Sequence, residues 1–581
     1  MKQNLSTPIP KKRQFLPIDF QLTPWENLKP FYDQLLNRRL TTLADLRGWL
    51  LDRSELEGAI ADDASWRYIN MTCDTTHEGY RRQYEEYVKD ILPQIMPLAH
   101  LLDEKAVQCM HIQALKQEAG FDLLLRCIEN NISLYRAENI PILTQLQVRE
   151  QEYSKVAGAM TVTLGGQELT LQQASIHLEA PERSLRAEVY QKIQQRRLQD
   201  QSTLDDLYTT LIKDRHQVAL NAGFENFRDY SFAALKRFDY TPQHCFAFHQ
   251  AVEGAVVPLL NELARERKAM LGVATLKPWD HAVDPMGKPP LQPFSDEADL
   301  LHKTIATFDR LDTSLGDCLR TMEAMGRFDL ASRKGKAPGG YNCSLEESGV
   351  PFIFMNASAK FFDMITMLHE GGHAIHSFVM HDLPINSFKQ ITSEMAELAS
   401  MSMELLTMDH WDIFFEKADD LARAKQQHLE QIISTLAWIA TIDKFQHWVY
   451  EHPYHTLEER RVAWHDILSS FSEHVTDWSG QEPFRDYMWQ KQLHFFDAPF
   501  YSIEYGIAQL GAIAVWRNYQ QNPAQGLQKY LNALQLGYTR SLPDMYATAG
   551  IAFDFRSSYI QELVTFVRDQ WRAIHTSGSC D

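Results

Sequence analysis

One segment constrains this chain more than any other. Residues 361–378 read FFDMITMLHEGGHAIHSF, an apolar run that contains two histidines four residues apart. Leu368 and Ile375 fall at helical spacing, which predicts a buried helix. Residues four apart lie on the same face of a helix, so His369 and His373 present their imidazoles side by side. The fold must therefore enclose this helix while one of its faces carries two imidazoles.

Two neutral imidazoles at this spacing are suited to a tetrahedral zinc ion, and Glu370 between them can reach a metal-bound water. The chain has 22 histidines and 76 acidic residues. By chance, about 0.1 five-residue windows with histidine first, an acidic residue second and histidine fifth are expected. The alternative is a pair of surface or core-edge histidines beside a solvated glutamate. His376 lies seven residues beyond His369, and we interpret it as a satisfied or substrate-lining histidine rather than a fourth ligand. The metzincin pattern is excluded, because it needs glycine and histidine where the chain has His376 and Val379.

Two consecutive glycines interrupt this helix. Gly371 and Gly372 each cost about 1 kcal/mol in a helix interior. We therefore expect another backbone or a ligand to approach closely at this point. Asn356 or Ser358 is available as the N-cap of the helix.

Zinc in a catalytic site needs a third protein ligand and an open position for water. Residues 391–405 place Glu394, Glu397 and Glu404 within an otherwise apolar helical segment. Burying a carboxylate without a partner costs free energy, so we expect a cation to bind near these three side chains. The residues alone do not select one of the three, and Glu404 could equally pair with a distant lysine or arginine.

The rest of the chain is predicted to be mostly helical. The exceptions are a β-hairpin over residues 160–171, centred on Gly165-Gly166, and a lone β-like run at 351–355 that leads into the zinc helix. We expect three parts: a flexible N-terminal arm over residues 1–20, an N-terminal helical lobe over 21–195, and a catalytic domain over 196–575.

Charge and composition exclude several classes of function. The chain has 581 residues and a net charge of −19, and such an acidic surface repels nucleic acid and anionic membranes. It is 44% hydrophobic, which excludes a disordered chain, yet no window reaches 18 apolar residues, so no membrane span is expected. Seven scattered cysteines and an N-terminus without a secretory pattern predict a cytoplasmic protein with reduced thiols.

Several motifs together resemble the oligoendopeptidase F branch of the thimet oligopeptidase family. HEGGHAIHSF at 369–378 is similar to the zinc helix of that family, and AELAS at 396–400 is similar to its third-ligand helix. The separation of 28 residues between His369 and Glu397 fits the family and implies that Glu397 is the third ligand. Three further strings resemble the glycine-rich loop, the cleft-edge strand and the C-terminal His/Tyr segment of the family: KGKAPGGY at 334–341, PFIFMN at 351–356 and HFFDAPFYSIEYGIAQLGA at 494–512. The resemblance covers roughly residues 140–560.

The resemblance implies a mainly α, two-lobed helical ellipsoid with a deep channel that admits short unstructured peptides, and one Zn²⁺ near its floor. His369, His373 and Glu397 would bind the metal, Glu370 would act as general base, and Glu404 would orient a ligand imidazole. The candidate oxyanion donors are Tyr505, Tyr501 and His494. The candidate substrate-binding residues are Gly339, Gly340, Tyr341, Phe352, Phe354 and His376.

The expected activity is zinc-dependent hydrolysis of internal peptide bonds in oligopeptides. A helical-cleft metallocarboxypeptidase or dipeptidyl carboxypeptidase is the main alternative, because it would share the zinc helix and the architecture. A peptide-binding scaffold with a degenerate motif is a non-enzymatic alternative. The sequence does not determine the preferred peptide, the oligomeric state, or whether manganese or cobalt replaces zinc in the cell.

Overall fold

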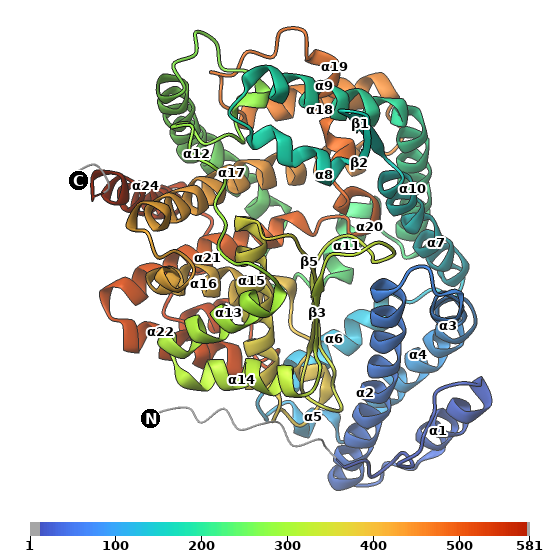
Figure 1. Ribbon diagram of the computed structural model, residues 1–581. Coiled ribbons are helices and arrows are strands. Elements are labelled where there is room, and N and C mark those ends of the chain that lie inside the picture. The colour runs from blue at the N-terminus through green and yellow to red at the C-terminus, as the bar shows by residue number, and fades with distance from the viewer. Residues whose placement is uncertain (1–11, 578–581) are drawn as a thin grey trace.

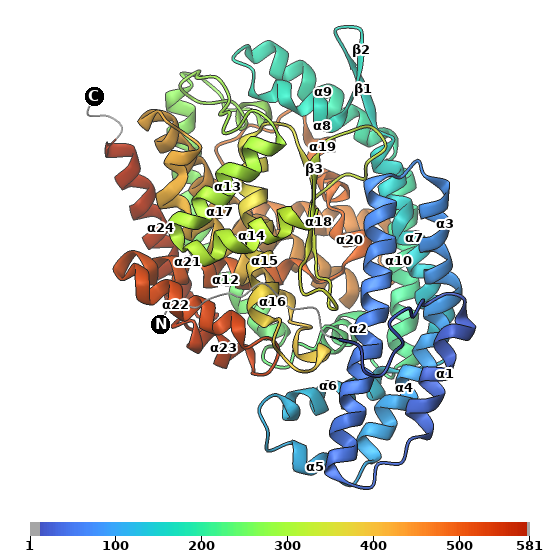
Figure 2. The same ribbon diagram turned by 60° about the horizontal axis from the view of Figure 1, so that its bottom comes forward.

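The computed structural model describes residues 12–577 and is built almost entirely of helices (Figure 1). Seven helices open the chain and lie together on one side of the molecule in both views (Figures 1 and 2). They are α1 (Trp25–Asn37), α2 (Leu43–Cys73), α3 (Glu78–Glu86), α4 (Leu92–Gln108), α5 (Ile112–Leu115), α6 (Phe121–Leu134) and α7 (Asn139–Gly158). Leu28, Leu46 and Trp49 lie in a hydrophobic core separate from the main one.

The predicted hairpin is confirmed. Strand β1 (Thr161–Leu164) pairs with β2 (Gln167–Thr170) in antiparallel register around Gly165 and Gly166, which both have positive φ. The helices that follow are α8 (Leu171–Ser175), α9 (Arg183–Gln199), α10 (Gln201–Asn221), α11 (Phe227–Ala234), α12 (Pro242–Met270), α13 (Glu297–Leu311) and α14 (Thr313–Ala324). Helix α9 continues through residue 195, so the expected boundary falls inside a helix; the division into lobes stays a prediction.

A three-stranded sheet leads into the histidine helix. Strand β5 (Phe352–Ala357) lies in the middle, parallel to β3 (Phe328–Ala331) and antiparallel to β4 (Tyr341–Cys343). The strand at 351–355 is thus confirmed, but it is neither lone nor at an edge. It is hydrogen-bonded on both sides, and β3 and β4 are the two edge strands of the sheet.

The C-terminal half is a helical assembly around one large core. Its helices are α15 (Phe361–Met380), α16 (Ser393–Leu406), α17 (Ala418–Glu451), α18 (Leu457–Phe471), α19 (Glu482–Asp486), α20 (His494–Asp497), α21 (Ser502–Gln521), α22 (Pro523–Gln535), α23 (Leu542–Thr548) and α24 (Ser557–Ser577). Helix α16 packs on both α15 and α21 (Figure 1). Among the helices within residues 12–577, none is both long and apolar enough to cross a membrane.

The start of α15 differs from the expected cap. Lys360 occupies the N-cap position, Asn356 lies in β5, and Ser358 precedes the cap. The carboxylate of Asp363 accepts the backbone N–H of both Ser358 and Lys360, at 2.6 and 3.0 Å. The N3 aspartate therefore satisfies the backbone N–H of the N-cap residue, as the acidic residue of a capping box does.

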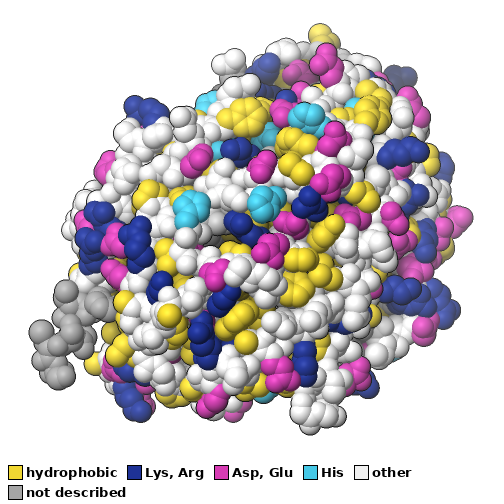
Figure 3. Space-filling view, turned by 90° about the horizontal axis from the view of Figure 1, so that it is seen from above, with side chains coloured by type: hydrophobic (Ala, Val, Ile, Leu, Met, Phe, Trp, Pro, Cys, Tyr) yellow, Lys and Arg dark blue, Asp and Glu magenta, His cyan; other side chains and the backbone are white. Residues whose placement is uncertain are grey.

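Part of the expected N-terminal arm is packed on the protein. The backbone N–H of Leu16 donates to Glu55 of α2 at 2.8 Å, and Arg13 pairs with Glu347 at 2.6 Å. Residues 1–11 lie outside the described residues. On the face shown in Figure 3, acidic and basic side chains are interspersed and form no large patch of one sign.

Candidate metal centre

Three side chains from two helices converge in the core of the C-terminal half. His369 and His373 lie one turn apart on α15, and Glu397 reaches them from α16. Glu397 Oε2 lies 3.2 Å from His369 Nε2 and 3.8 Å from His373 Nε2, and the three ligand atoms lie within 4.8 Å of one another. Donor atoms of a tetrahedral zinc site are about 3.3 to 3.5 Å apart. The donor set and its spacing therefore fit a zinc ion.

The two glycines allow this convergence. A Cβ on Gly372 would lie 2.6 Å from Ser400 Cα and 2.8 Å from the carbonyl oxygen of Ala399, both on α16. A Cβ on Gly371 would lie 2.7 Å from the ring of Phe308. The expected close approach of another backbone is confirmed, since α15 and α16 meet at a distance that only glycine permits.

The carboxylate of Glu397 is held on both of its oxygens. Tyr501 donates its hydroxyl to Oε1 at 2.9 Å, and Ser400 donates to Oε2 at 3.1 Å. Burial disfavours ionisation of Glu397, but the contacts with His369, His373 and Tyr501 outweigh it and lower its pKa to about 2. Glu397 is therefore an anion with Oε2 directed at the histidines.

Glu404 contacts the far nitrogen of the first histidine. Its Oε1 lies 2.6 Å from His369 Nδ1, and its Oε2 lies 3.5 Å from Nε2 of the buried His428 on α17. A hydrogen bond at Nδ1 leaves the Nε2 lone pair of His369 free for a metal. Burial alone would lower the pKa of His369, but Glu397 and Glu404 raise it well above its ordinary value, so a metal ion at Nε2 would displace a proton.

Glu370 lies beside this cluster without a partner of its own. Its side chain is 6% exposed, and Oε2 has no hydrogen-bond partner. Burial raises its pKa to about 7, a value suited to taking up and returning a proton near neutrality. Burial also lowers the pKa of His373 to about 4, which keeps that imidazole neutral.

Three aromatic rings from the C-terminal segment border the cluster. Tyr501 directly precedes α21, Tyr505 lies in its first turn, and His494 begins α20. Their ring centroids are 5.0 to 5.9 Å apart. Tyr501 is engaged by Glu397, whereas the half-buried Tyr505 lies close enough to Glu397 and Glu370 for burial and both carboxylates to raise its pKa well above its ordinary value. The Tyr505 hydroxyl therefore keeps its proton. Burial lowers the pKa of His494, whose Nδ1 lies 2.6 Å from Gln492.

The glycine-rich loop and the sheet contact α2. The Tyr341 hydroxyl lies 2.6 Å from Thr72 Oγ1, and its ring stacks on Phe354 at 4.8 Å. Gly339 has a φ of +99°, and a Cβ on Gly340 would lie 3.4 Å from the carbonyl oxygen of Phe354.

Three of the expected substrate-binding residues have buried side chains. Phe352 and Phe354 are buried with Ile69 of α2 in a small hydrophobic cluster. His376 is 1% exposed, and burial lowers its pKa to about 3. In this conformation these three side chains pack inside the protein, and their role in binding a peptide stays a prediction.

Several residues of the centre were not expected from the sequence. Ser400 and His428 contact the carboxylates, and Asn342 of β4 donates to the backbone carbonyl of Glu370 at 3.4 Å. Ser400 follows Glu397 by three residues on a helix, a spacing that could have indicated the contact. His428 and Asn342 come from distant segments and carry no local signal.

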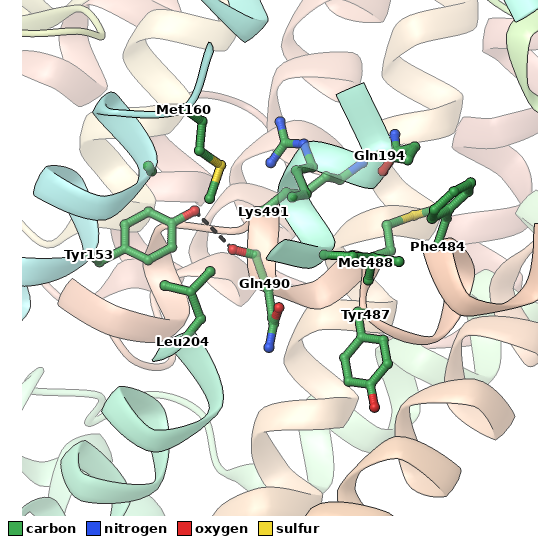
Figure 4. A pocket seen from close by; sticks show the side chains of 12 residues that line it. Tyr153, Met160, Gln194, Leu204, Phe484, Tyr487, Met488, Gln490 and Lys491 are labelled. Carbon is green, nitrogen blue, oxygen red and sulfur yellow. Dashed lines mark hydrogen bonds between the residues drawn. The ribbon is translucent and has the colours of Figure 1, made fainter. Parts of the chain in front are cut away.

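A pocket elsewhere is lined by none of the expected site residues (Figure 4). It lies between α7, α9 and residues 484–491, where Tyr153 donates its hydroxyl to the carbonyl of Gln490 at 3.0 Å. The candidate metal centre is thus distinct from this cavity.

Comparisons with known proteins agree with the geometry. The model of peptidase family M3 matches residues 176–565, and that of the peptidase M3 N-terminal domain matches residues 15–135. The oligoendopeptidase F homolog of Borreliella burgdorferi is 21% identical over 66% of this chain and 64% of its own length. The group B oligopeptidase PepB of Streptococcus agalactiae is 21% identical over 64% of this chain and 61% of its own length. These curated relatives are thus matched over slightly less than two thirds of their length.

A solved structure extends the similarity to nearly the whole chain. The structure of PZ peptidase A with inhibitor 2 superposes with a TM-score of 0.90 at 25% identity. The superposition covers 96% of this chain and 99% of that one. The fold described above is therefore that of a solved peptidase along almost its full length.

Proposed function

This chain belongs to peptidase family M3, in its oligoendopeptidase F branch, and from that premise we propose that it is a zinc-dependent endopeptidase acting on short, unstructured peptides. The observation that carries the proposal is the convergence of His369, His373 and Glu397 beside Glu370, a buried carboxylate with a free oxygen. This combination supplies a metal site and a proton acceptor at one place.

His369, His373 and Glu397 would hold the metal, and a bound zinc ion supplies a water of lowered pKa and a positive charge that polarises a carbonyl. Glu404 keeps His369 in the tautomer that binds through Nε2, and Tyr501 keeps Glu397 oriented.

Glu370 moves the proton. With a pKa raised to about 7 by burial, its carboxylate takes a proton from the attacking water and returns it to the leaving amine. Tyr505 is the candidate donor to the developing oxyanion, because its hydroxyl keeps its proton and the hydroxyl of its neighbour Tyr501 is already engaged with Glu397.

The peptide would pair with the free edge of β4. An extended peptide adds to a sheet through main-chain hydrogen bonds, and only an edge strand can accept it. Asn342 ties β4 to the carbonyl of Glu370, so this edge runs beside the proposed base. We also propose that the chain divides into an N-terminal lobe over residues 21–195 and a catalytic domain over residues 196–575. A channel in the protein would admit only unstructured peptides.

The test is cleavage mapping on a peptide library by mass spectrometry, with and without a chelator, using free and C-terminally amidated peptides. Internal cuts in both sets, abolished by chelator and restored by Zn²⁺, are expected. Loss of cleavage on amidation would instead indicate a carboxypeptidase. Activity that resists chelation would contradict the metal mechanism.

A further inference from the structure

A second group of metal-binding side chains lies buried between α12 and α17. Cys245 and His249 are one turn apart on α12, and Asp443 and His447 are one turn apart on α17. The two helices pack against each other (Figure 1). Each helix therefore presents an i, i+4 pair of potential ligands to the other, the arrangement that places His369 and His373 together on α15.

The potential ligand atoms lie close together. One ligand atom from each of Cys245, Asp443 and His447 falls within 4.8 Å of the other two. Asp443 Oδ2 lies 3.4 Å from His447 Nε2 and 2.8 Å from His249 Nε2. These separations are those of donor atoms around one small cation, with His249 hydrogen-bonded to the carboxylate from the other side.

Buried polar atoms at this place lack partners. His447 is 2% exposed; its Nε2 faces Asp443 at 3.4 Å without a well-aligned hydrogen bond, and its Nδ1 has no hydrogen-bond partner. Asp443 is fully buried, and its Oδ1 also has no partner. Polar groups without partners are rare in protein interiors, and a bound ion is one of the recognised explanations.

Aromatic rings surround this cluster. The rings of Phe246 and Phe500 lie 4.9 and 5.4 Å from the His447 ring, and Phe471 lies 6.2 Å from that of His249. An ion held between the two helices would therefore be shielded from solvent, as a structural ion is.

We propose that Cys245, Asp443 and His447 bind a second, structural divalent ion of the zinc class, which fastens α12 to α17. One thiolate and one carboxylate balance the charge of a divalent cation, and the thiol proton leaves to solvent on binding. A sulfur, a nitrogen and an oxygen ligand together select zinc or cobalt over magnesium or calcium. His249 positions the Asp443 carboxylate.

Cobalt substitution of the full-length protein tests this site separately from the catalytic one. A thiolate bound to Co²⁺ absorbs in the near ultraviolet by charge transfer, and the cluster of His369, His373 and Glu397 contains no sulfur. We expect this absorption in the wild type and in His373→Ala, and its loss in Cys245→Ser. Cys318→Ser is the matched control, since Cys318 is equally buried and donates to the carbonyl of Ser314 at 3.3 Å.

Metal analysis gives an independent count. The wild type should bind two zinc ions per chain, and His373→Ala and His447→Gln one each. His447→Gln should retain peptide hydrolysis and lose the cobalt–thiolate absorption, so it serves if Cys245→Ser fails to fold. A wild type whose single zinc is lost in His373→Ala, or a cobalt-loaded wild type without charge-transfer absorption, would overturn the proposal whether or not the enzyme is active.

Discussion

Glu404 Oε1 lies 2.6 Å from Nδ1 of His369, while Nε2 of the same ring lies 3.2 Å from Glu397. The imidazole is thus hydrogen-bonded at Nδ1, and its Nε2 faces the position that a metal ion would take. Partners of this kind raise the basicity of a ligand histidine and fix its orientation.

Replacing Glu404 should weaken metal binding without removing a ligand. We expect Glu404→Ala to reduce zinc affinity about 10- to 100-fold, measured by competition with a chromophoric chelator. Glu404→Gln keeps an acceptor oxygen for the Nδ1–H and should lose less. Equal affinity in the alanine variant and the wild type would show that the contact does not orient the ligand.

Removing the proposed base should separate chemistry from metal binding. Glu370→Gln should keep one zinc at the catalytic cluster and lower kcat by about 10² to 10⁴, because the amide cannot accept the proton. Glu416→Gln, on an exposed side chain, is the control and should be fully active. Wild-type turnover in Glu370→Gln would remove this residue from the mechanism.

The two tyrosines should respond differently to loss of the hydroxyl. Tyr505→Phe is expected to lower kcat about 10² to 10³-fold with little change in KM, as for a lost oxyanion donor. Tyr501→Phe frees Glu397 Oε1 and should chiefly weaken metal binding. If Tyr501→Phe lowers kcat at saturating zinc and Tyr505→Phe does not, the two roles are exchanged.

Local spacing explains what could be predicted from the sequence. The buried helix with His369 and His373, the hairpin around Gly165 and the close approach at Gly372 each follow from residues near one another in the chain. Helical and strand periods are local properties, so one sequence suffices to recognise them.

Features that depend on contacts between distant parts of the chain could not be predicted from the sequence. Strand β5 was expected to be lone because its partners, β3 and β4, are only four and three residues long and carry no alternating pattern. The engagement of Tyr501 by Glu397 joins residues 104 positions apart. The burial of Phe352 and Phe354 depends on α2, nearly 300 residues upstream, and nothing near them in the chain indicates this contact.

The carboxyl group of Asp62 should make stability depend on pH. It accepts the backbone N–H groups of Glu346 and Glu347, yet burial raises its pKa from 3.8 to about 7. Between pH 4 and 7 the native protein therefore holds a proton that the unfolded chain has released, and the free energy of unfolding falls as pH rises through this window. The contribution of the Asp62 carboxyl to the free energy of unfolding is therefore fully present below pH 4 and is lost as the pH rises through about 7.

Comparison with Asp62→Asn isolates this contribution, because the asparagine does not titrate. Relative to the variant, the wild type should lose about 2 to 4 kcal/mol of unfolding free energy between pH 4 and 7. Denaturant unfolding at several pH values measures the difference. A difference that stays constant across the window would mean that Asp62 is ionised in the native protein throughout.

Adding one methyl group at Gly372 should separate the two helices that carry the proposed metal ligands. The new Cβ would lie 2.6 Å from Ser400 Cα, so α15 and α16 must move apart, and overpacking of this kind costs about 1 to 3 kcal/mol. We expect Gly372→Ala to lower the unfolding temperature and weaken zinc binding together, because Glu397 moves with α16. Gly48→Ala is the matched control: it lies within α2 with no atom within 4 Å of its Cβ, so it should gain up to about 1 kcal/mol from helix propensity. A stabilised Gly372→Ala with unchanged zinc affinity would mean that the helices tolerate a wider separation than their contact indicates.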